Sequence, residues 1–266
     1  VKVESIADAI NENADVKALK QSFVDAFAGF EDMLHDHLIT NVMSVNEMKE
    51  QDAIAEEIFR RLQSIALVDK YTAYQALADN WQTIVNDIET IQTDGMEAVR
   101  AVEQAYKIKK DGDDEVEVPD GLKGRILPFE LVQSVKFQSE LDAIAQMQAE
   151  VDECVSNLED APNNFTEEET TVYLEDGDSP KLNKKKITSD AKTKGDSIEP
   201  ETKAKLKEIV ALWDKQSKTN KAIKVAKADL ESKTIDTIQN LTDVEVDEFL
   251  HLKWVTPIYD LSLIHI

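Results

Sequence analysis

Apolar residues recur every three or four positions through most of the chain, which is the spacing of one face of an α-helix. Three such stretches follow one another in the first part of the chain, at Leu19–Leu34, 51–66 and 67–91. A short strand at 88–92 is the alternative for the end of the third stretch, but its alternation is imperfect. Because antiparallel helices bury such faces against each other, residues 1–92 are expected to form a helical bundle.

The pattern changes after Asp94-Gly95, a dipeptide that favours a turn. Residues 96–110 predict a short helix, or a helix that passes into a strand at 105–108. Val116-Glu117-Val118 then alternates like a strand, and the polar run before it is typical of a turn. Residues 93–137 are therefore expected to be a small mixed α/β segment that contains a β-hairpin.

Residues 138–254 predict two long helices joined by a polar connector. In both helices the apolar residues alternate at spacings of three and four, which is the pattern of a coiled coil. The connector, at about 159–200, is rich in Asp, Glu, Lys, Ser and Thr and is expected to be mobile. Polar residues occupy four places in the predicted seams: Gln148, Gln216, Asn220 and Lys227.

The return helix leads to a capping box at Thr242 and Glu245, which predicts a short final helix ending near Trp254. Residues 255–266 form a tail. The predicted fold class is thus mainly α: a helical bundle with a long antiparallel coiled-coil-like helical hairpin and a small β-hairpin element.

The composition agrees with long helices, because the 266 residues include only 7 glycines and 6 prolines. The formal charge of −24 repels a phosphate backbone, so the chain as a whole is a poor DNA-binding surface. Residues 181–233 hold 15 Lys against 8 Asp and Glu, a balance of +7 that leaves −31 for the rest. Such a basic segment is typical of a solvated face. Contact with an acidic partner, or with phosphates around Lys184–Lys186, is the alternative.

Cys154 is the only cysteine, which excludes a disulfide framework and a multi-thiolate metal site. No apolar run approaches the roughly 20 residues that span a bilayer, and no signal sequence is visible. A cytoplasmic protein without membrane contact is therefore expected. The chain opens on Val1, so a fragment is expected, and residues 261–266 are either translated sequencing-adapter read-through or a genuine apolar end.

The sequence offers no arrangement typical of a hydrolase or a metal site. His35 and His37 are two positions apart, which places them on different helix faces, and they are expected to be surface histidines. His251 is isolated, so no Ser-His-Asp arrangement can be argued. The acidic run 111–117 lacks the ligand spacing of a calcium loop and is expected to be a solvated turn.

The third helical stretch contains a motif, L-V-D-x-Y-x-x-Y-Q-x-L-x-D-x-W, in which Asp69 is the predicted N-cap. It resembles a segment of the modification (M) subunits of type I restriction–modification systems, which methylate adenine in DNA. Gly124–Val132 resembles an apolar-proline segment of that family, and the end of the chain resembles its terminal K-W element. The residues that match these motifs, read physically as core and helix positions, are Tyr71, Tyr74, Gln75, Asp79, Trp81, Lys253 and Trp254.

The resemblance implies the region that follows the catalytic domain of a DNA adenine-N6 methyltransferase, whose cofactor is S-adenosylmethionine. Such a domain needs a glycine-rich turn and an Asn-Pro-Pro-aromatic loop that holds the flipped base. Neither is present, because no two prolines adjoin and no glycine-rich turn lies between a strand and a helix. No catalytic, cofactor-binding or metal-binding residue is therefore assigned, and S-adenosylmethionine is expected only in the parent protein.

The role that the resemblance implies is assembly. The helices would dock on the DNA-specificity subunit, while the restriction subunit and DNA are met through the assembled complex. Leu206, Ile209 and Trp213 are the candidate contact residues, although the same stripe would also serve to close the hairpin on itself. The alternative function is a stand-alone coiled-coil interaction or scaffold protein.

Overall fold

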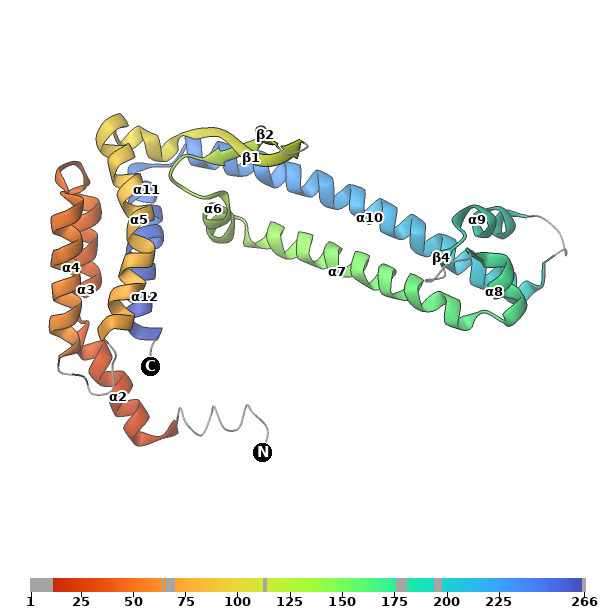
Figure 1. Ribbon diagram of the computed structural model, residues 1–266, viewed down its shortest axis with the longest axis horizontal. Coiled ribbons are helices and arrows are strands. Elements are labelled where there is room, and N and C mark those ends of the chain that lie inside the picture. The colour runs from red at the N-terminus through yellow and green to blue at the C-terminus, as the bar shows by residue number, and fades with distance from the viewer. Residues whose placement is uncertain are drawn as a thin grey trace. The chain divides into compact units, whose positions relative to one another are not determined.

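The computed structural model describes residues 12–63, 65, 70–111, 114–175, 181–193 and 198–264, and these residues are mainly helical (Figure 1). The chain forms two compact units. Unit 1 combines residues 1–132 with residues 234–266, and unit 2 is residues 133–233. The boundaries predicted from the sequence lie at 92, 137 and 254. The two compact units differ from these predicted segments because the C-terminal segment packs on the first helices, a long-range pairing that no local pattern reveals.

Unit 1 is a helical bundle with a β-hairpin. α5 lies against α4 and α12, and α3 lies against the π-helical turn His251–Val255. The helices of this unit are α2 (Ala14–Ala26), α3 (Phe30–His35), α4 (Glu47–Leu62), α5 (Lys70–Asp94), α11 (Asp243–Leu250) and α12 (Thr256–Ile264).

The first helical stretch is broken in the middle. Gly29 has a φ of 71°, a left-handed conformation that favours glycine, and it separates α2 from α3. The expectation of one helical pattern through Gly29 is therefore wrong. Phe27 and Phe30 are nevertheless both buried, with ring centroids 5.3 Å apart. Arg61 Nη1 donates to the carbonyl oxygens of Ala26 and Ala28 and so satisfies backbone acceptors that the helix end leaves free.

The helix predicted to continue to Ile91 is confirmed. α5 runs without interruption through residues 88–92, so the alternative strand there is wrong. Ile84, Ile88 and Ile91 are all buried, which is the outcome of helical rather than alternating spacing. The predicted N-cap, Asp69, lies outside the described residues.

The small β-hairpin is confirmed, and it is longer than expected. β1 (Val102–Asp111) pairs antiparallel with β2 (Asp114–Gly124), with an irregularity between Gln104 and Tyr106. Only a 3₁₀ turn, Met96–Arg100, precedes β1, so a helix through residue 110 is wrong. Pairing with β2 overrides the weak local preference of this segment for a helix.

Unit 2 contains two long helices with further structure between them. The connector expected to be mobile holds two short helices and two short paired strands, because their few apolar residues pack on α10. The elements are α6 (Phe129–Lys136, which crosses the unit boundary), α7 (Gln138–Asp160), α8 (Glu167–Tyr173), β3 (Leu174–Glu175), β4 (Lys181–Leu182), α9 (Lys184–Lys192) and α10 (Pro200–Gln239, which belongs to unit 2 through Lys233).

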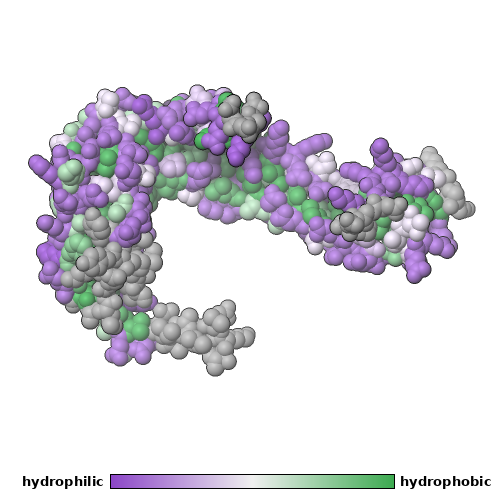
Figure 2. Space-filling model, in the orientation of Figure 1, coloured by the Kyte–Doolittle hydropathy of each residue, from purple (hydrophilic) through white to green (hydrophobic). Residues whose placement is uncertain are grey.

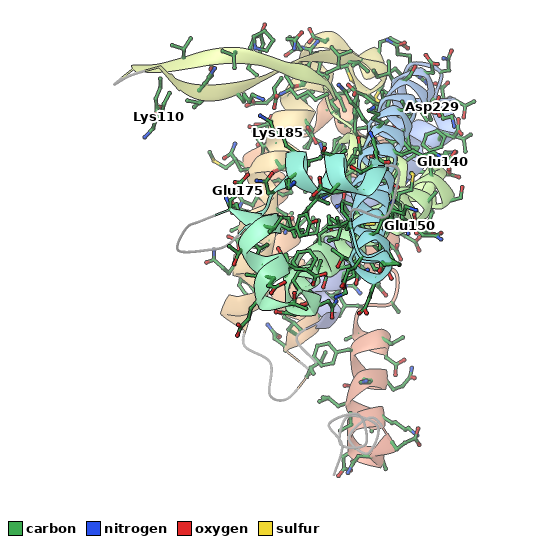
Figure 3. The ribbon with its side chains drawn as sticks, turned by 90° about the vertical axis from the view of Figure 1, so that its right-hand side faces the viewer. Lys110, Glu140, Glu150, Glu175, Lys185 and Asp229 are labelled. Carbon is green, nitrogen blue, oxygen red and sulfur yellow. The ribbon has the colours of Figure 1, made fainter. Side chains whose placement is uncertain are left out.

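Within unit 2, α7 and α10 lie side by side with opposite chain directions (Figure 1). Buried residues of the two helices include Val151 and Cys154 on α7 and Ile223 and Leu230 on α10. Figure 2 shows hydrophobic surface on the face where the two helices adjoin. Lys233 bridges them, with Nζ 3.4 Å from Glu140 of α7 and 2.9 Å from Asp229 of α10; Figure 3 labels both carboxylates.

The apolar positions of the two predicted helix stripes are buried or half-buried, but three of the four polar positions in them are not. Gln148, Asn220 and Lys227 are exposed, whereas the half-buried places belong to Met147, Thr219 and Ala226. A straight helix has 3.6 residues per turn, so a buried stripe drifts away from a strict alternation of three and four. Three of the predicted polar positions therefore lie outside the buried stripe, whereas Gln216 is half-buried.

The capping box at the start of α11 is confirmed, with Thr242 and Glu245 each bonded to the backbone of the other. The final helix does not end near Trp254, however. The chain passes through the π-helical turn His251–Val255 directly into α12, whose second residue is Pro257. Proline is tolerated in the first turn of a helix because the N–H it lacks has no intrahelical partner there. Among the described residues, no helix combines the length and the apolar character that crossing a bilayer requires.

Candidate functional site

A buried carboxylate in unit 1 is joined to the Lys253-Trp254 pair. Asp87, on α5, is 8% exposed, and its Oδ2 lies 2.5 Å from Lys253 Nζ. The same oxygen accepts a hydrogen bond of 2.8 Å from Trp254 Nε1. Lys253 Nζ also donates to the carbonyl oxygen of Ile126. Lys253 thus ties the K-W element to α5, through Asp87, and to the apolar-proline segment at Gly124–Val132, through the carbonyl oxygen of Ile126.

The charges of Asp87 and Lys253 balance each other, but burying them costs desolvation free energy. Burial raises the pKa of Asp87, while the positive charge of Lys253 and the hydrogen bonds from Lys253 and Trp254 oppose the rise. A buried pair of this kind adds little net stability, but loss of one partner leaves an uncompensated charge. The arrangement therefore favours one packing of α5 against the C-terminal segment over others.

The remaining motif residues divide between core and surface. Trp81 is buried, 5% exposed. Gln75 and Asp79 are exposed, and Gln75 Nε2 donates to Asp79 Oδ1 over 2.8 Å. The side chains of Tyr71 and Tyr74 lie outside the described part of the chain. Sequence reasoning misses Asp87, because a single Asp within a long helix carries no spacing signal.

The histidines are not simply surface residues. His35 Nε2 lies 2.8 Å from Asp247 Oδ2, and His251 Nε2 lies 2.8 Å from Glu31 Oε1. The two imidazole rings are 5.5 Å apart, so each histidine reaches a carboxylate on the segment of the other. His37 Nδ1 is separately 2.6 Å from Glu50. The contacts of His35 and His251 join α3 to the C-terminal segment, and the described residues contain no group of side chains arranged to hold a metal ion.

The three candidate contact residues lie on α10 in unit 2, and they are not equally accessible. Leu206 and Ile209 are 0% and 3% exposed, because Tyr173, Ile187 and Ala191 of α8 and α9 cover them. Trp213 packs only at the edge of this apolar cluster. Of the three, Trp213 is therefore the residue that a partner can touch.

Polar contacts hold α8 and α9 in place over this cluster. Tyr173 Oη donates to Asp190 Oδ2 over 3.2 Å, and burial raises the pKa of Tyr173, as does Asp190. Glu169 accepts 2.6 Å from Thr202 Oγ1 and lies 3.3 Å from Lys205 Nζ. Burial works against the charge of Glu169, but these bonds together hold its pKa below the ordinary value.

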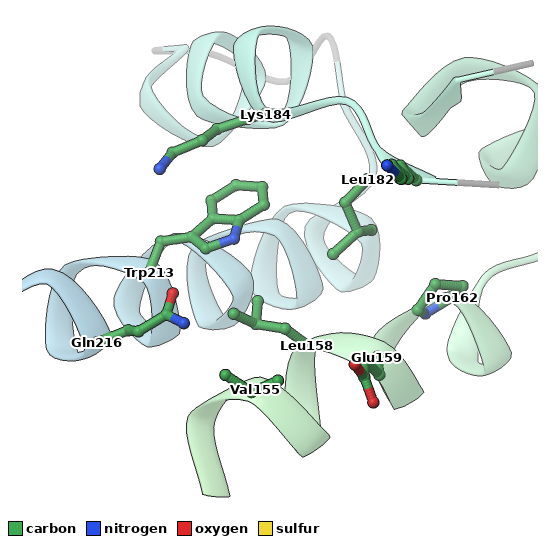
Figure 4. Close-up of a pocket in the computed structure, with 9 residues that line it drawn as sticks. Val155, Leu158, Glu159, Pro162, Leu182, Lys184, Trp213 and Gln216 are labelled. Atoms are coloured by element: carbon green, nitrogen blue, oxygen red, sulfur yellow. The ribbon is translucent and has the colours of Figure 1, made fainter. Parts of the chain in front are cut away.

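Beside Trp213 there is a groove of about 450 Å³. Figure 4 shows the indole between Lys184 on one side and Leu158 on the other. Lys184 Nζ is 5.2 Å from the centroid of the Trp213 ring, within the range of a cation–π interaction. The groove is lined by Val155, Leu158, Glu159, Pro162, Lys181, Leu182, Lys184, Trp213 and Gln216.

The groove continues the basic character of its surroundings. A second shallow hollow, on α9, is lined by Lys184, Lys185, Thr188, Ser189 and Lys192. Lys186 is paired with Asp190, but no salt bridge joins Lys181, Lys184, Lys185 or Lys192 to a carboxylate in the described ranges. The charge of these lysines is therefore directed to the surface.

Comparison with known proteins gave no matching family model, no matching curated protein and no matching solved structure.

Proposed function

We propose that this chain is the C-terminal assembly region of a type I DNA-modification subunit. In this proposal it docks on the DNA-specificity subunit and positions the methyltransferase domain of the same subunit around DNA. The restriction subunit and the DNA are reached through the complete complex. The parent protein is a cytoplasmic, S-adenosylmethionine-dependent adenine-N6 methyltransferase, and the residues of this chain contribute binding rather than chemistry.

The observation that supports the proposal is that Lys253 joins the Lys253-Trp254 pair both to α5, at Asp87, and to the segment at Gly124–Val132, at Ile126. The segment around Trp81, the segment at Gly124–Val132 and the Lys253-Trp254 pair lie far apart in the sequence, and each is short. In unit 1, α5 supplies both Trp81 and Asp87, while Lys253 bonds to Asp87 and to the backbone of Ile126. The proposal therefore rests on the order of these short motifs in the sequence together with the contacts that join two of them to α5.

The proposal includes the finer architecture of unit 2. We infer that α7 and α10 act as a coiled-coil-like antiparallel hairpin, whose seam holds the two helices together while its far end presents α8, α9 and Trp213. Bundle docking through apolar and aromatic side chains is a common mode of helical recognition. The stand-alone scaffold remains the alternative function, since the same seam also serves a hairpin that only closes on itself.

The test is co-expression of the chain with a type I DNA-specificity subunit, followed by size-exclusion chromatography with mass measurement by light scattering. The proposal expects one complex that contains both chains and survives dilution to micromolar concentration. The matched control is the chain alone under the same conditions. Separate elution of two well-folded chains would leave the stand-alone scaffold as the better account.

A further inference from the structure

We propose that the groove beside Trp213 is a docking site for an acidic segment of a partner protein that carries an apolar or aromatic anchor residue. The inference rests on the proposed assembly function and deepens it, because it names the surface and the chemistry of the partner that this surface takes. It concerns unit 2 alone.

The floor of the groove suits an apolar anchor. Three elements supply it: Leu158 from α7, Leu182 from β4 and Trp213 from α10. Trp213 packs against the cluster of Leu206 and Ile209 beneath it, so its ring is held before any partner arrives. A tryptophan in such a pocket loses little conformational entropy on binding, which is one reason that tryptophan dominates interface energies.

The rim of the groove suits negative charge. Lys181 and Lys184 line it, against a single carboxylate, Glu159. Lys185 and Lys192 extend the positive surface along α9. Lysines at the start of a helix are unfavourable to that helix by roughly 0.3–1 kcal/mol each, because the helix dipole is positive there. Lys184 and Lys185 therefore stand where they weaken α9, which indicates that helix stability is not the reason for their placement.

The surroundings favour an acidic protein segment over a nucleic acid. Duplex DNA carries one charge per roughly 1.7 Å of its axis, so it needs a long and continuous positive surface. Carboxylates interrupt the positive surface, since Glu159 lines the groove itself and Asp190 is paired with Lys186 on α9. A short segment with a few carboxylates around one apolar side chain matches both the size of the groove and its mixed charge.

The experiment is a selection of random 12-residue peptides displayed on phage against the purified full chain, with counter-selection on Trp213→Ala. Expected is enrichment of sequences in which Asp or Glu flank Leu, Phe or Trp. The best sequences are then synthesised with a fluorescent label, and their affinity is measured by anisotropy at low and at physiological salt.

Two variants distinguish the contribution of the apolar anchor site to peptide binding from the contribution of the lysine charges. Trp213→Ala is expected to weaken binding by about tenfold or more, as an aromatic anchor does. The double variant Lys181→Glu/Lys184→Glu leaves the apolar cluster intact and is expected to weaken binding by a similar factor. The matched controls on α10 are Val225→Ala, an exposed apolar residue, and Lys221→Glu/Lys224→Glu, exposed lysines; both are expected to bind within about twofold of wild type.

Four results would overturn the proposal. Equal enrichment on wild type and Trp213→Ala would show that the peptides do not bind at Trp213. Enrichment of neutral or basic peptides would show that the groove does not select an acidic segment. Tighter binding of duplex or single-stranded oligonucleotides, lost in the lysine variant, makes the surface a nucleic-acid contact. Concentration-dependent dimerisation that Trp213→Ala abolishes makes the occupant a second copy of the chain.

The proposal for the groove and the proposal for the assembly function can be refuted independently of each other. If selected peptides bind as expected but no complex forms with the specificity subunit, the groove stands and the assembly function is wrong. If the complex forms equally well with wild type, Trp213→Ala and the lysine variant, the assembly function stands and the groove is not its contact surface.

Discussion

At the scale of single residues, the most consequential position is Asp87. Its carboxylate accepts hydrogen bonds from Lys253 and Trp254, which are 166 and 167 residues away in the sequence. Among the buried side-chain nitrogen and oxygen atoms of the described residues, none lacks a hydrogen-bond partner. A charge pair whose hydrogen bonds are all made in this way specifies how α5 and the C-terminal segment pack. Removing one of the two charged residues leaves the other charge buried without a partner, which lowers the stability of the fold.

Lys253→Met is therefore expected to destabilise the chain by about 3 kcal/mol, because the Asp87 carboxylate stays buried without its cation. The double variant Asp87→Asn/Lys253→Met removes both charges and keeps an acceptor for Trp254, so it is expected to recover most of that loss. Urea unfolding of the single and double variants measures both. Lys107→Met, which breaks an exposed pair with Asp120, is the control and should cost less than about 1 kcal/mol. A double variant less stable than Lys253→Met would contradict this account.

A second residue-scale prediction concerns acid stability. Hydrogen bonds from Arg60, and then from Arg61, lower the pKa of Glu57 from 4.5 to about 2. A depressed pKa gives stability that is complete above 4.5 and is lost as the pH falls from 4.5 toward 2. Glu57→Gln is expected to cost about 1 kcal/mol at pH 7, after allowance for solvent screening, and to flatten the loss of stability between pH 4.5 and 2.

Thermal or urea unfolding across this pH range measures the effect. The matched control is Glu56→Gln, the exposed neighbour of Glu57, which should leave the pH profile unchanged. An identical slope for wild type and Glu57→Gln would show that the arginine pairs do not stabilise the carboxylate.

At the scale of elements, the strongly periodic segments are predictable from the sequence and the weakly periodic ones are not. α5 carries apolar residues at helical spacing along its length, and tertiary packing only reinforces that preference. The segment 159–200 hides a few apolar residues among many charged ones. Its order depends on Tyr173, Ile187 and Ala191 packing on α10, a contact that composition does not reveal.

Ile187→Ala tests this segment. Ile187 is 0% exposed, and its truncation is expected to cost about 2–5 kcal/mol locally and to release α8 and α9 from α10. Hydrogen exchange should then show faster exchange in α8 and α9, while α5 keeps its protection. Ser189→Ala, at an exposed position of the same helix, is the control. Exchange in wild-type α8 and α9 at the rate of an unfolded chain would instead support the mobile connector that the sequence predicts.

The candidate site is less predictable than the helices, for physical reasons that the individual residues show. The K-W pair is visible in the sequence, but Asp87 is one of 54 Asp and Glu residues, and only the fold reveals its partners. Trp213 is visible as part of an apolar stripe. Trp213 is more exposed than Leu206 and Ile209 because α8 and α9 cover only the first two side chains on α10, and the sequence pattern does not show where that cover ends.

At the scale of the whole molecule, the two units contain different features of the proposed function. Unit 1 contains the buried Asp87–Lys253 pair that joins α5 to the C-terminal segment, and unit 2 bears the basic groove. The net charge of −24 disfavours broad contact with DNA, which agrees with a role in binding other proteins.

The central claim, that the chain is part of a DNA adenine methyltransferase subunit, is tested most directly by sequencing the coding region upstream of Val1. The account predicts one open reading frame that carries a glycine-rich turn between a strand and a helix, followed by an Asn-Pro-Pro-aromatic motif. A long upstream frame that lacks both motifs, or a stop codon close before Val1, would contradict the claim.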